Sequence, residues 1–141
     1  MNIAIVVNSI NRGGAGRQAC ELASYFAANN HTVTLIPING ITTHGNYTVD
    51  DRVELMHLDH APTDVHPQRL LGRLLNFVRM RRLLSNTCTD VVFAFLPYGI
   101  MLTLFAAIGK SLPVVACERS YPLARISSEN NLFRRMALRF F

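Results

Sequence analysis

The chain has 141 residues, of which 50% are hydrophobic and 16% are charged. This length suits one domain with a substantial core and is too short for two ordinary domains. Its formal net charge of +5 is uneven: residues 1–66 carry three basic and six acidic side chains (−3), and residues 67–141 carry eleven and three (+8). No basic motif with interleaved aromatic residues occurs, so we do not expect a nucleic-acid partner.

The three cysteines, Cys20, Cys88 and Cys117, form an odd set without a C-x-x-C pair. This pattern favours a reducing compartment and buried thiols over a disulfide framework. The first residues lack the positive charge and the long apolar region of a signal peptide. We therefore expect a cytoplasmic protein.

The first predicted element is the apolar run of residues 3–7, which is rich in β-branched residues and does not alternate. Such a run is typical of a parallel strand covered on both faces. Gly13, Gly14 and Gly16 follow, and a helix beginning near Ala15 would present free N–H groups and its positive dipole end to a ligand. This corner suits a phosphate. A tight turn that only packs the helix on the strand would also explain the glycines.

The spacing of these glycines argues against two common nucleotide sites. A dinucleotide fingerprint needs G-x-G-x-x-G directly after the strand and an acidic residue ending the second strand, which here ends at Asn39. A P-loop needs Lys followed by Ser or Thr, where this chain has Arg17 and Gln18. A nicotinamide-dependent oxidoreductase or epimerase is therefore disfavoured.

Hydrophobic periodicity predicts the remaining elements. The first helix should end at Asn29-Asn30, because asparagine tolerates the left-handed conformation of a helix C-terminus. The resulting order predicts an α/β fold: a Rossmann-like open parallel sheet with helices on both faces. The expected ranges are helix 15–28, strand 31–38, strand 52–58 near an edge, helix 68–85, strand 90–96, a helix ending at Gly109, strand 112–117 and helix 132–141.

A membrane-spanning helix is an alternative for residues 91–109, which contain no charged residue and are nearly long enough to cross a bilayer. The segment Pro97-Tyr98-Gly99 divides this stretch into a β-branched, aromatic part and a helix-forming part. We therefore favour a strand followed by a helix.

A metal cluster is an alternative for the loop at residues 59–67, where His60 and His66 accompany His57, with Asp59 and Asp64 between them. The spacing matches none of the usual zinc patterns. We expect a solvated loop and no metal site.

Parallel strands end at one edge of their sheet, and ligands of open α/β sheets bind outside those ends. Residues 8–16, 97–99 and 118–121 should therefore converge on one crevice. Within it, Glu118 beside Arg119 could orient a hydroxyl group or bind an anion. A local ion pair or helix cap is the alternative for these two residues.

Five segments are distinctive when taken together. They are R-G-G-A-G-R (12–17), Q-A-C-E-L-A (18–23), T-V-T-L-I (32–36), V-V-F-A-F-L (91–96) and V-V-A-C-E-R-S-Y-P (114–122). In these segments the chain resembles, over nearly all its length, the N-terminal domain of retaining glycosyltransferases of family four, which have the GT-B fold. Family members usually read G-G-A-E-R at the corner, where this chain has Gly16. The C-E-R-S-Y-P segment is similar to an S-E-R-[ND]-x-P type found in a subgroup that assembles surface polysaccharides and oligosaccharides.

The resemblance implies that residues 1–141 form the acceptor-side half of a two-domain enzyme whose nucleotide-sugar-binding domain is absent here, so that the fragment alone is inactive. It implies a nucleotide-sugar donor, a saccharide or lipid-linked acceptor, same-face attack with retention, and no essential metal or other cofactor. The implied residues are Gly13, Gly14, Ala15 and Gly16 for the donor, Glu118 and Arg119 for catalysis, and Pro97, Tyr98 and Ser120 for the acceptor. A non-catalytic Rossmann-like module that binds a nucleotide or a protein remains the alternative.

Two expected helices are cationic and amphipathic, 68–85 and 132–141. Their arginines could attract an anionic membrane surface while neighbouring leucines and phenylalanines enter the interface. Ordinary solvated arginines on the outer face of a helix are the alternative. We expect, if the acceptor is lipid-linked, a peripheral protein on the inner face of the membrane. The arginines are Arg69, Arg73, Arg79, Arg81 and Arg82 in the first helix and Arg134, Arg135 and Arg139 in the second.

Overall fold

The structure, a computed structural model, describes residues 1–11, 13–39, 47–58 and 68–118. Strands and helices alternate along most of this part of the chain, as the periodicity predicted. The elements are β1 (Asn2–Val7), α1 (Gly14–Ala28), β2 (Thr32–Pro37), β3 (Glu54–Leu55), α2 (Gln68–Asn86), β4 (Val91–Phe95), α3 (Leu96–Ala107) and β5 (Val114–Cys117).

The five strands form one sheet in the order β3-β2-β1-β4-β5, and every pairing is parallel. Val6 of β1 is paired with Ile36 of β2 and with Ala94 of β4. Phe95 at the end of β4 is paired with Cys117 at the end of β5. The carboxyl ends of the central strands therefore lie at one edge, and the predicted Rossmann-like α/β fold is confirmed.

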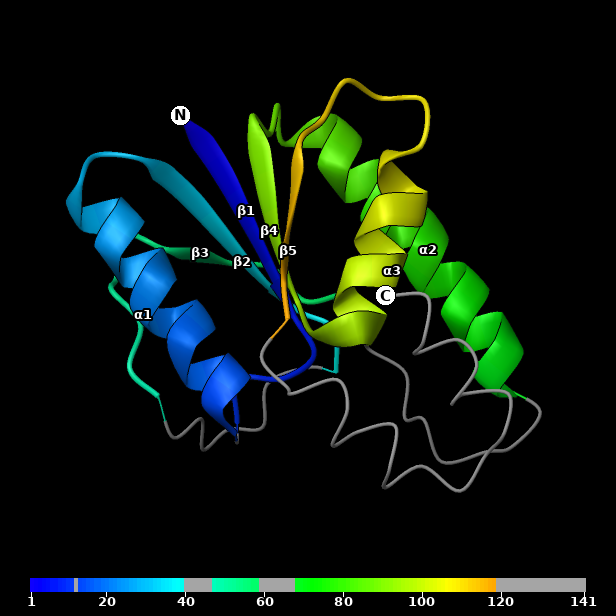
Figure 1. Ribbon diagram of the computed structural model, residues 1–141, viewed down its shortest axis with the longest axis horizontal. Coiled ribbons are helices and arrows are strands. Elements are labelled where there is room, and N and C mark those ends of the chain that lie inside the picture. Colours follow the sequence, from blue (N-terminus) through cyan, green and yellow to red (C-terminus); the bar gives the residue numbers. More distant parts are fainter. Residues whose placement is uncertain (12, 40–46, 59–67, 119–141) are drawn as a thin grey trace.

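The sheet is covered on both faces, with α1 on one side and α2 and α3 on the other (Figure 1). Ile3, Ile5 and Val7 of β1 belong to the core under α1, whereas Ala4 and Val6 belong to the core under α2 and α3. All five side chains are buried. This double burial explains why β1 is a continuous apolar run instead of an alternating pattern.

Small side chains let α1 lie close to the sheet. Ala19, Ala23 and Ala27 follow one another at helical spacing on its buried face. The helix ends where predicted, because Asn30 adopts a left-handed conformation with φ 62°. The N–H of His31 then donates to the carbonyl of Phe26 across 3.1 Å, which turns the chain into β2.

Two predicted boundaries are wrong. The strand expected over residues 52–58 contains only Glu54–Leu55, because it pairs with β2 alone at the edge of the sheet. Residues 97–99 were expected to separate β4 from the next helix, but α3 begins directly after Phe95. Proline favours the first helical turn because its fixed φ suits the helix and its missing N–H has no partner there.

The apolar residues of the amphipathic helix predicted over residues 68–85 include Leu74, Leu75 and Val78, but these three do not lie on the buried face of α2. Leu74, Leu75 and Val78 are 62%, 51% and 42% exposed. Met80 and the polar Asn76 are buried instead. The helix contacts the sheet and α3 along only part of its circumference, so residues on its outer side stay in solvent whatever their polarity.

The prediction for the cysteines is partly wrong. Cys20 is buried on the inner face of α1, and this burial, with a smaller contribution from the charge of Glu21, raises the pKa of its thiol. Cys117 is half-buried, whereas Cys88 is exposed in the loop before β4. None of the three cysteines forms a disulfide bond.

Residues 91–109 do not form a membrane-spanning helix, since they are divided into β4 and α3. Among the residues that the structure describes, no helix is both long enough and apolar enough to cross a bilayer. The predicted helix over residues 132–141 and the two histidines His60 and His66 lie outside the described residues.

Candidate active site

Three strand ends meet at the carboxyl edge of the sheet. The register pairs Val6 with Ala94 and Phe95 with Cys117, so the residues that follow β1, β4 and β5 emerge side by side. β4 leads directly into α3, and β1 leads through a short loop into α1. Both helices therefore begin at this edge. The predicted convergence of residues 8–16 with residues 97–99 is therefore present in the fold.

The corner between β1 and α1 is built on a fixed backbone. The N–H groups of Ile38 and Asn39 donate to the carbonyls of Val7 and Asn8, each at 2.9 Å, so the ladder with β2 extends past the last residue of β1. Gly13 then precedes α1 with φ 90° and ψ 157°, a conformation that essentially only glycine adopts. This glycine lets the chain turn sharply into the helix.

The beginning of α1 is open. Gly13 and Gly14 are exposed, and a Cβ added to either would meet no described atom within 4 Å. No described side chain caps the first turn by a hydrogen bond. The free N–H groups and the positive end of the helix dipole could therefore receive an anion or a polar ligand atom.

Ala15 and Gly16 of the predicted donor site face the protein. Ala15 packs against the core under α1. Gly16 is buried, and a Cβ there would lie 2.6 Å from the carbonyl oxygen of Ser9 and 3.2 Å from the Cα of Ile10. The missing side chain of Gly16 therefore allows α1 to pack on the loop that precedes it.

Two polar side chains border this corner. The hydroxyl of Tyr47 donates to the carbonyl of Gly13 across 3.3 Å. Arg17 forms an ion pair with Glu21 one turn later, with 2.8 Å between Nε and Oε1. This hydrogen bond and the charge of Glu21 raise the pKa of Arg17, so its guanidinium already has a carboxylate partner.

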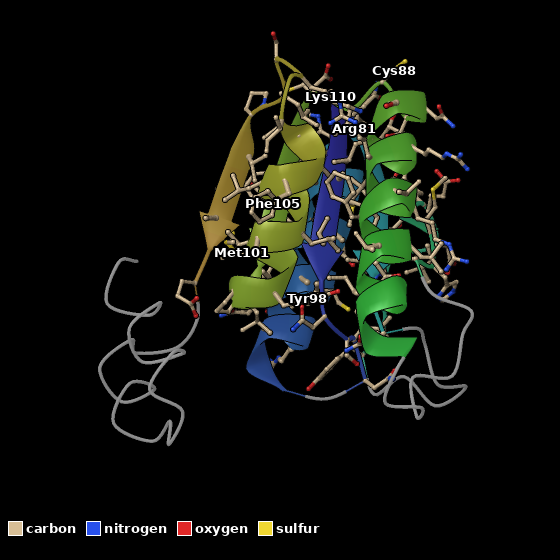
Figure 2. All side chains as sticks on the ribbon, turned by 90° about the vertical axis from the view of Figure 1, so that its right-hand side faces the viewer. Arg81, Cys88, Tyr98, Met101, Phe105 and Lys110 are labelled. Carbon is tan, nitrogen blue, oxygen red and sulfur yellow. The ribbon has the colours of Figure 1, made fainter. Side chains whose placement is uncertain are left out.

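The corner between β4 and α3 has no intervening loop. Leu96 adopts a left-handed φ of 65°, which is uncommon for a residue with a Cβ. It allows Phe95 to end the strand and Pro97 to enter the first helical turn. Figure 2 shows Tyr98 at this end of α3, opposite the end where Arg81 and Lys110 lie.

The two corners touch each other through Gly99 in the first turn of α3. A Cβ added to Gly99 would lie 3.5 Å from Oδ1 of Asn8 and 3.8 Å from Cγ1 of Val6 and Cδ1 of Ile38. Because Gly99 is buried there, the first turn of α3 rests directly on the carboxyl ends of β1 and β2.

The predicted catalytic residues are only partly within the described chain. Glu118 follows Cys117 at the end of β5 and is exposed. Arg119 and Ser120 lie outside the described residues. Glu118 is thus at the predicted edge of the sheet, beside the end of β4.

Sequence reasoning missed three side-chain amides at this edge. The oxygens of Asn8, Asn11 and Gln18 are buried without a hydrogen-bond partner among the described residues. A polar residue directly after a fully buried strand was an available signal for Asn8. Asn11 belongs to no pattern that would distinguish it from an ordinary loop residue. Gln18 begins the distinctive segment Q-A-C-E-L-A, but that segment assigns no role to its side chain.

The described part of the chain contains no group of three His, Cys, Asp or Glu side chains that could hold a metal ion. The functional groups found at the carboxyl edge are backbone N–H groups, amides, the phenol of Tyr98 and the carboxylate of Glu118. The N–H groups can donate to phosphate oxygens, whereas the carboxylate and the amide oxygens can accept from hydroxyl groups.

Comparison with known proteins agrees with this geometry. A relative from Campylobacter jejuni, GalNAc-alpha-(1->4)-GalNAc-alpha-(1->3)-diNAcBac-PP-undecaprenol alpha-1,4-N-acetyl-D-galactosaminyltransferase, is 25% identical over 120 residues, which cover 85% of this chain. The chain spans 33% of the length of that relative. The family model described as Glycosyltransferase Family 4 matches residues 12–141. The chain therefore belongs to glycosyltransferase family 4.

Proposed function

We propose that this chain supplies the acceptor-side half of an enzyme that transfers a sugar from a nucleotide-sugar donor to a saccharide or a lipid-linked saccharide. The observation that carries the proposal is the family match over residues 12–141, on a chain whose strand ends and open helix N-terminus meet at one edge. The second half would be a nucleotide-sugar-binding domain. Its need is supported by the chain covering a third of the Campylobacter relative.

The proposed step breaks the bond between the anomeric carbon of the sugar and a phosphate oxygen of the nucleotide. A hydroxyl oxygen of the acceptor bonds to that carbon on the same face, with retention, and the hydroxyl proton leaves with the departing phosphate. The open N–H groups at Gly13 and Gly14 would stabilise the negative charge that develops on the phosphate. No resident metal is required for this scheme.

The other residues predicted for the site are assigned roles at the same carboxyl edge of the sheet. Glu118 and Arg119 would orient the acceptor hydroxyl or the transferred sugar, and Pro97, Tyr98 and Ser120 would contact the acceptor. Ala15 and Gly16 would support the donor site from behind, since both face the protein. The acceptor named for the Campylobacter relative carries a PP-undecaprenol group. We therefore favour a lipid-linked acceptor in the assembly of surface polysaccharide or oligosaccharide.

Glycosyl transfer tests the proposal. The 141-residue chain and its fusion to the nucleotide-sugar-binding domain of the Campylobacter relative are incubated with labelled nucleotide sugars and with saccharide and lipid-linked acceptors. We expect no turnover by the chain alone and turnover by the fusion. Turnover by the chain alone would contradict the division into two halves. A folded fusion that transfers no sugar would favour a non-catalytic module.

Gly14→Val in the active fusion tests the role of the corner. A Cβ at Gly14 meets no described atom within 4 Å, so the variant should fold normally while its side chain occupies the space in front of the helix. We expect turnover to fall by at least about tenfold, the loss of roughly one charge-assisted contact. Gly72→Val on α2 is the matched control, since a Cβ there is equally unhindered. Unchanged turnover in Gly14→Val would leave the corner as a packing turn.

A lipid-linked acceptor would bring the protein to an anionic membrane, and the outer face of α2 is the proposed contact. Leu74, Leu75 and Val78 are exposed there, and neither α2 nor α3 contains a carboxylate. Arg81 points elsewhere, because its guanidinium donates to the carbonyls of Ala106 and Ile108 at the end of α3. The exposed Arg82 is a better candidate for a lipid phosphate.

Flotation with vesicles of increasing phosphatidylglycerol content tests this contact. We expect binding that rises with anionic lipid, falls at high salt, and is weakened by Leu75→Gln and Arg82→Gln. Tyr25→Gln is the control, since Tyr25 is an exposed large side chain on α1, across the sheet. Binding that ignores lipid charge and salt, or no binding, would reject the contact and favour a soluble acceptor in the cytoplasm.

A further inference from the structure

Unpaired polar atoms are concentrated at the corner between β1 and α1. In the described part of the chain, five buried side-chain nitrogen or oxygen atoms have no hydrogen-bond partner, and three of them lie within residues 8–18. All three are amide oxygens. The five are Oδ1 of Asn8, Oδ1 of Asn11, Oε1 of Gln18, Nδ1 of His31 and Oγ1 of Thr103.

A buried polar atom without a partner destabilises a fold, so such atoms are few and usually have a functional or solvent-mediated explanation. The other two atoms lie elsewhere: His31 precedes β2 at the opposite edge of the sheet, and Thr103 lies in the middle of α3. The carboxyl edge is therefore the one place in the described chain where several such atoms gather.

The backbone of Asn8 is held while its side-chain oxygen is unpaired. Its carbonyl accepts from the N–H of Asn39, which fixes the chain after β1. In the alternation of β1, Asn8 is in phase with Ala4 and Val6 and so belongs to the side of α2 and α3. Its Oδ1 accordingly faces Gly99 in the first turn of α3.

Gln18 approaches the same edge from the other face. It precedes Leu22 by one turn of α1, and Leu22 and Phe26 pack against the core that contains Phe95. The ring of Phe26 lies 5.4 Å from that of Phe93 of β4. Gln18 is therefore on the flank of α1 that faces β4, at the carboxyl end of the strand.

Asn11 lies between these two residues, in the loop that joins β1 to α1. Its N–H donates to the hydroxyl of Ser9 across 3.2 Å, which shapes the loop and leaves the side chain uninvolved. All three residues are only partly buried, so each also borders the surface. The three residues thus lie at the carboxyl end of β1, with Asn8 on the side of α2 and α3, Gln18 on α1 and Asn11 in the loop that joins β1 to α1.

The chemistry of these atoms selects their ligand. An amide oxygen only accepts hydrogen bonds, so it needs a donor. A sugar has several hydroxyl donors, whereas a nucleotide phosphate presents mainly acceptor oxygens and suits the N–H groups of α1 instead. The terminal torsion of an amide is soft, and an unpaired oxygen breaks no hydrogen bond when it rotates toward a ligand.

We propose that the amides of Asn8, Asn11 and Gln18 form a hydroxyl-binding set that holds the saccharide at the carboxyl edge of the sheet. This inference rests on the proposed glycosyltransferase function and adds binding residues for the sugar to it. The set divides the corner into two parts: backbone N–H groups at Gly13 and Gly14 for phosphate, and side-chain amides for sugar hydroxyls.

The side-chain NH₂ signals of the isotopically labelled 141-residue chain test the proposal by NMR. Methyl glycosides of hexoses and N-acetylhexosamines are added in one series and inorganic pyrophosphate in another. We expect at least one methyl glycoside to shift the NH₂ signals of the three residues, and pyrophosphate to shift the backbone signals of Gly13 and Gly14 instead. Deoxy glycosides that lack the bound hydroxyl should lose the effect.

The outcomes separate this inference from the proposed function. Glycosides that shift other signals and leave the three amides unmoved would overturn the hydroxyl-binding set while the enzyme assignment stands. Amides that respond to pyrophosphate and not to glycosides would also overturn it. Absence of any response, with no transfer by the fused enzyme, would overturn both.

Substitutions of Asn11 add a test that a purely structural role would not satisfy. Asn11→Ala should weaken glycoside binding about fivefold, the effect of losing one neutral hydrogen bond. Asn11→Asp keeps an acceptor oxygen and should bind within about twofold of the parent. Thr103→Val is the control, because it removes a buried, unpaired oxygen that lies away from the carboxyl edge. This variant should bind the glycoside as tightly as the parent chain. Equal losses in Asn11→Ala and Asn11→Asp would contradict acceptance from a hydroxyl.

Discussion

The two corners at the carboxyl edge make the same turn from strand to helix by different means. Between β1 and α1 the chain uses a loop that ends in Gly13, at φ 90°. Between β4 and α3 it uses no loop, and Leu96 takes the positive φ of 65°. The first corner leaves a helix N-terminus open, whereas the second brings Tyr98 to the edge and Gly99 against Asn8. A sharp turn alone therefore does not require glycine. At the first corner Gly13 supplies a backbone conformation that excludes a side chain, and Gly16 allows α1 to pack closely on the loop before it.

Gly16→Ala should have the largest effect on the first corner. The new Cβ would lie 2.6 Å from the backbone oxygen of Ser9, which cannot move without displacing the end of β1. We expect a loss of about 3 kcal/mol of unfolding free energy, at the upper end of overpacking effects. Urea denaturation measures it, with the unhindered Gly14→Ala as control. A loss equal to that of the control would mean that α1 does not pack on this loop.

Gly13→Ala tests the conformational demand at the same corner. A Cβ added to Gly13 would meet no described atom within 4 Å, so a steric clash is not expected. Any loss of unfolding free energy would come from the backbone, because a φ of 90° with a ψ of 157° disfavours a residue with a side chain. The expected cost is about 2 kcal/mol. Thermal unfolding of this variant beside Gly14→Ala provides the measurement. Equal stability of the two variants would remove the distinction between Gly13 and its neighbour.

Leu96→Val tests the second corner. A β-branched residue is disfavoured at a positive φ, so this conservative change should cost about 1 kcal/mol more than the volume change alone. Leu96→Asn should be better tolerated by the backbone, because asparagine adopts the left-handed region readily. If urea denaturation shows that Leu96→Val is more stable than Leu96→Asn, the positive φ of Leu96 does not determine which residues this position tolerates.

Gly99→Ala should have the smallest effect on stability. Its Cβ would be 3.5 Å from Oδ1 of Asn8, an ordinary contact, and alanine favours the helix by up to about 1 kcal/mol. We expect unchanged or slightly raised stability by thermal unfolding. A clear loss would show that the two corners fit more tightly than the distance indicates.

Local sequence patterns were sufficient for the order of the elements that the structure describes and for the parallel sheet. The apolar run of β1 required burial on both faces, and Asn29-Asn30 marked the end of α1 because asparagine tolerates a left-handed φ. The glycines marked an exposed corner at Gly13 and Gly14. These features depend on neighbouring residues and on periodicity, which a linear chain displays directly.

Other features were decided only by contacts between distant segments. Position 16 requires glycine because a Cβ there would clash with the carbonyl oxygen of Ser9. The side-chain oxygen of Asn8 is buried without a hydrogen-bond partner near Gly99, a residue far away in the sequence. Leu74 and Val78 satisfy a helical apolar pattern but stay exposed, because α2 contacts its neighbours on one side only. Packing partners, steric limits and unsatisfied hydrogen bonds arise when the elements assemble, and no local pattern encodes them.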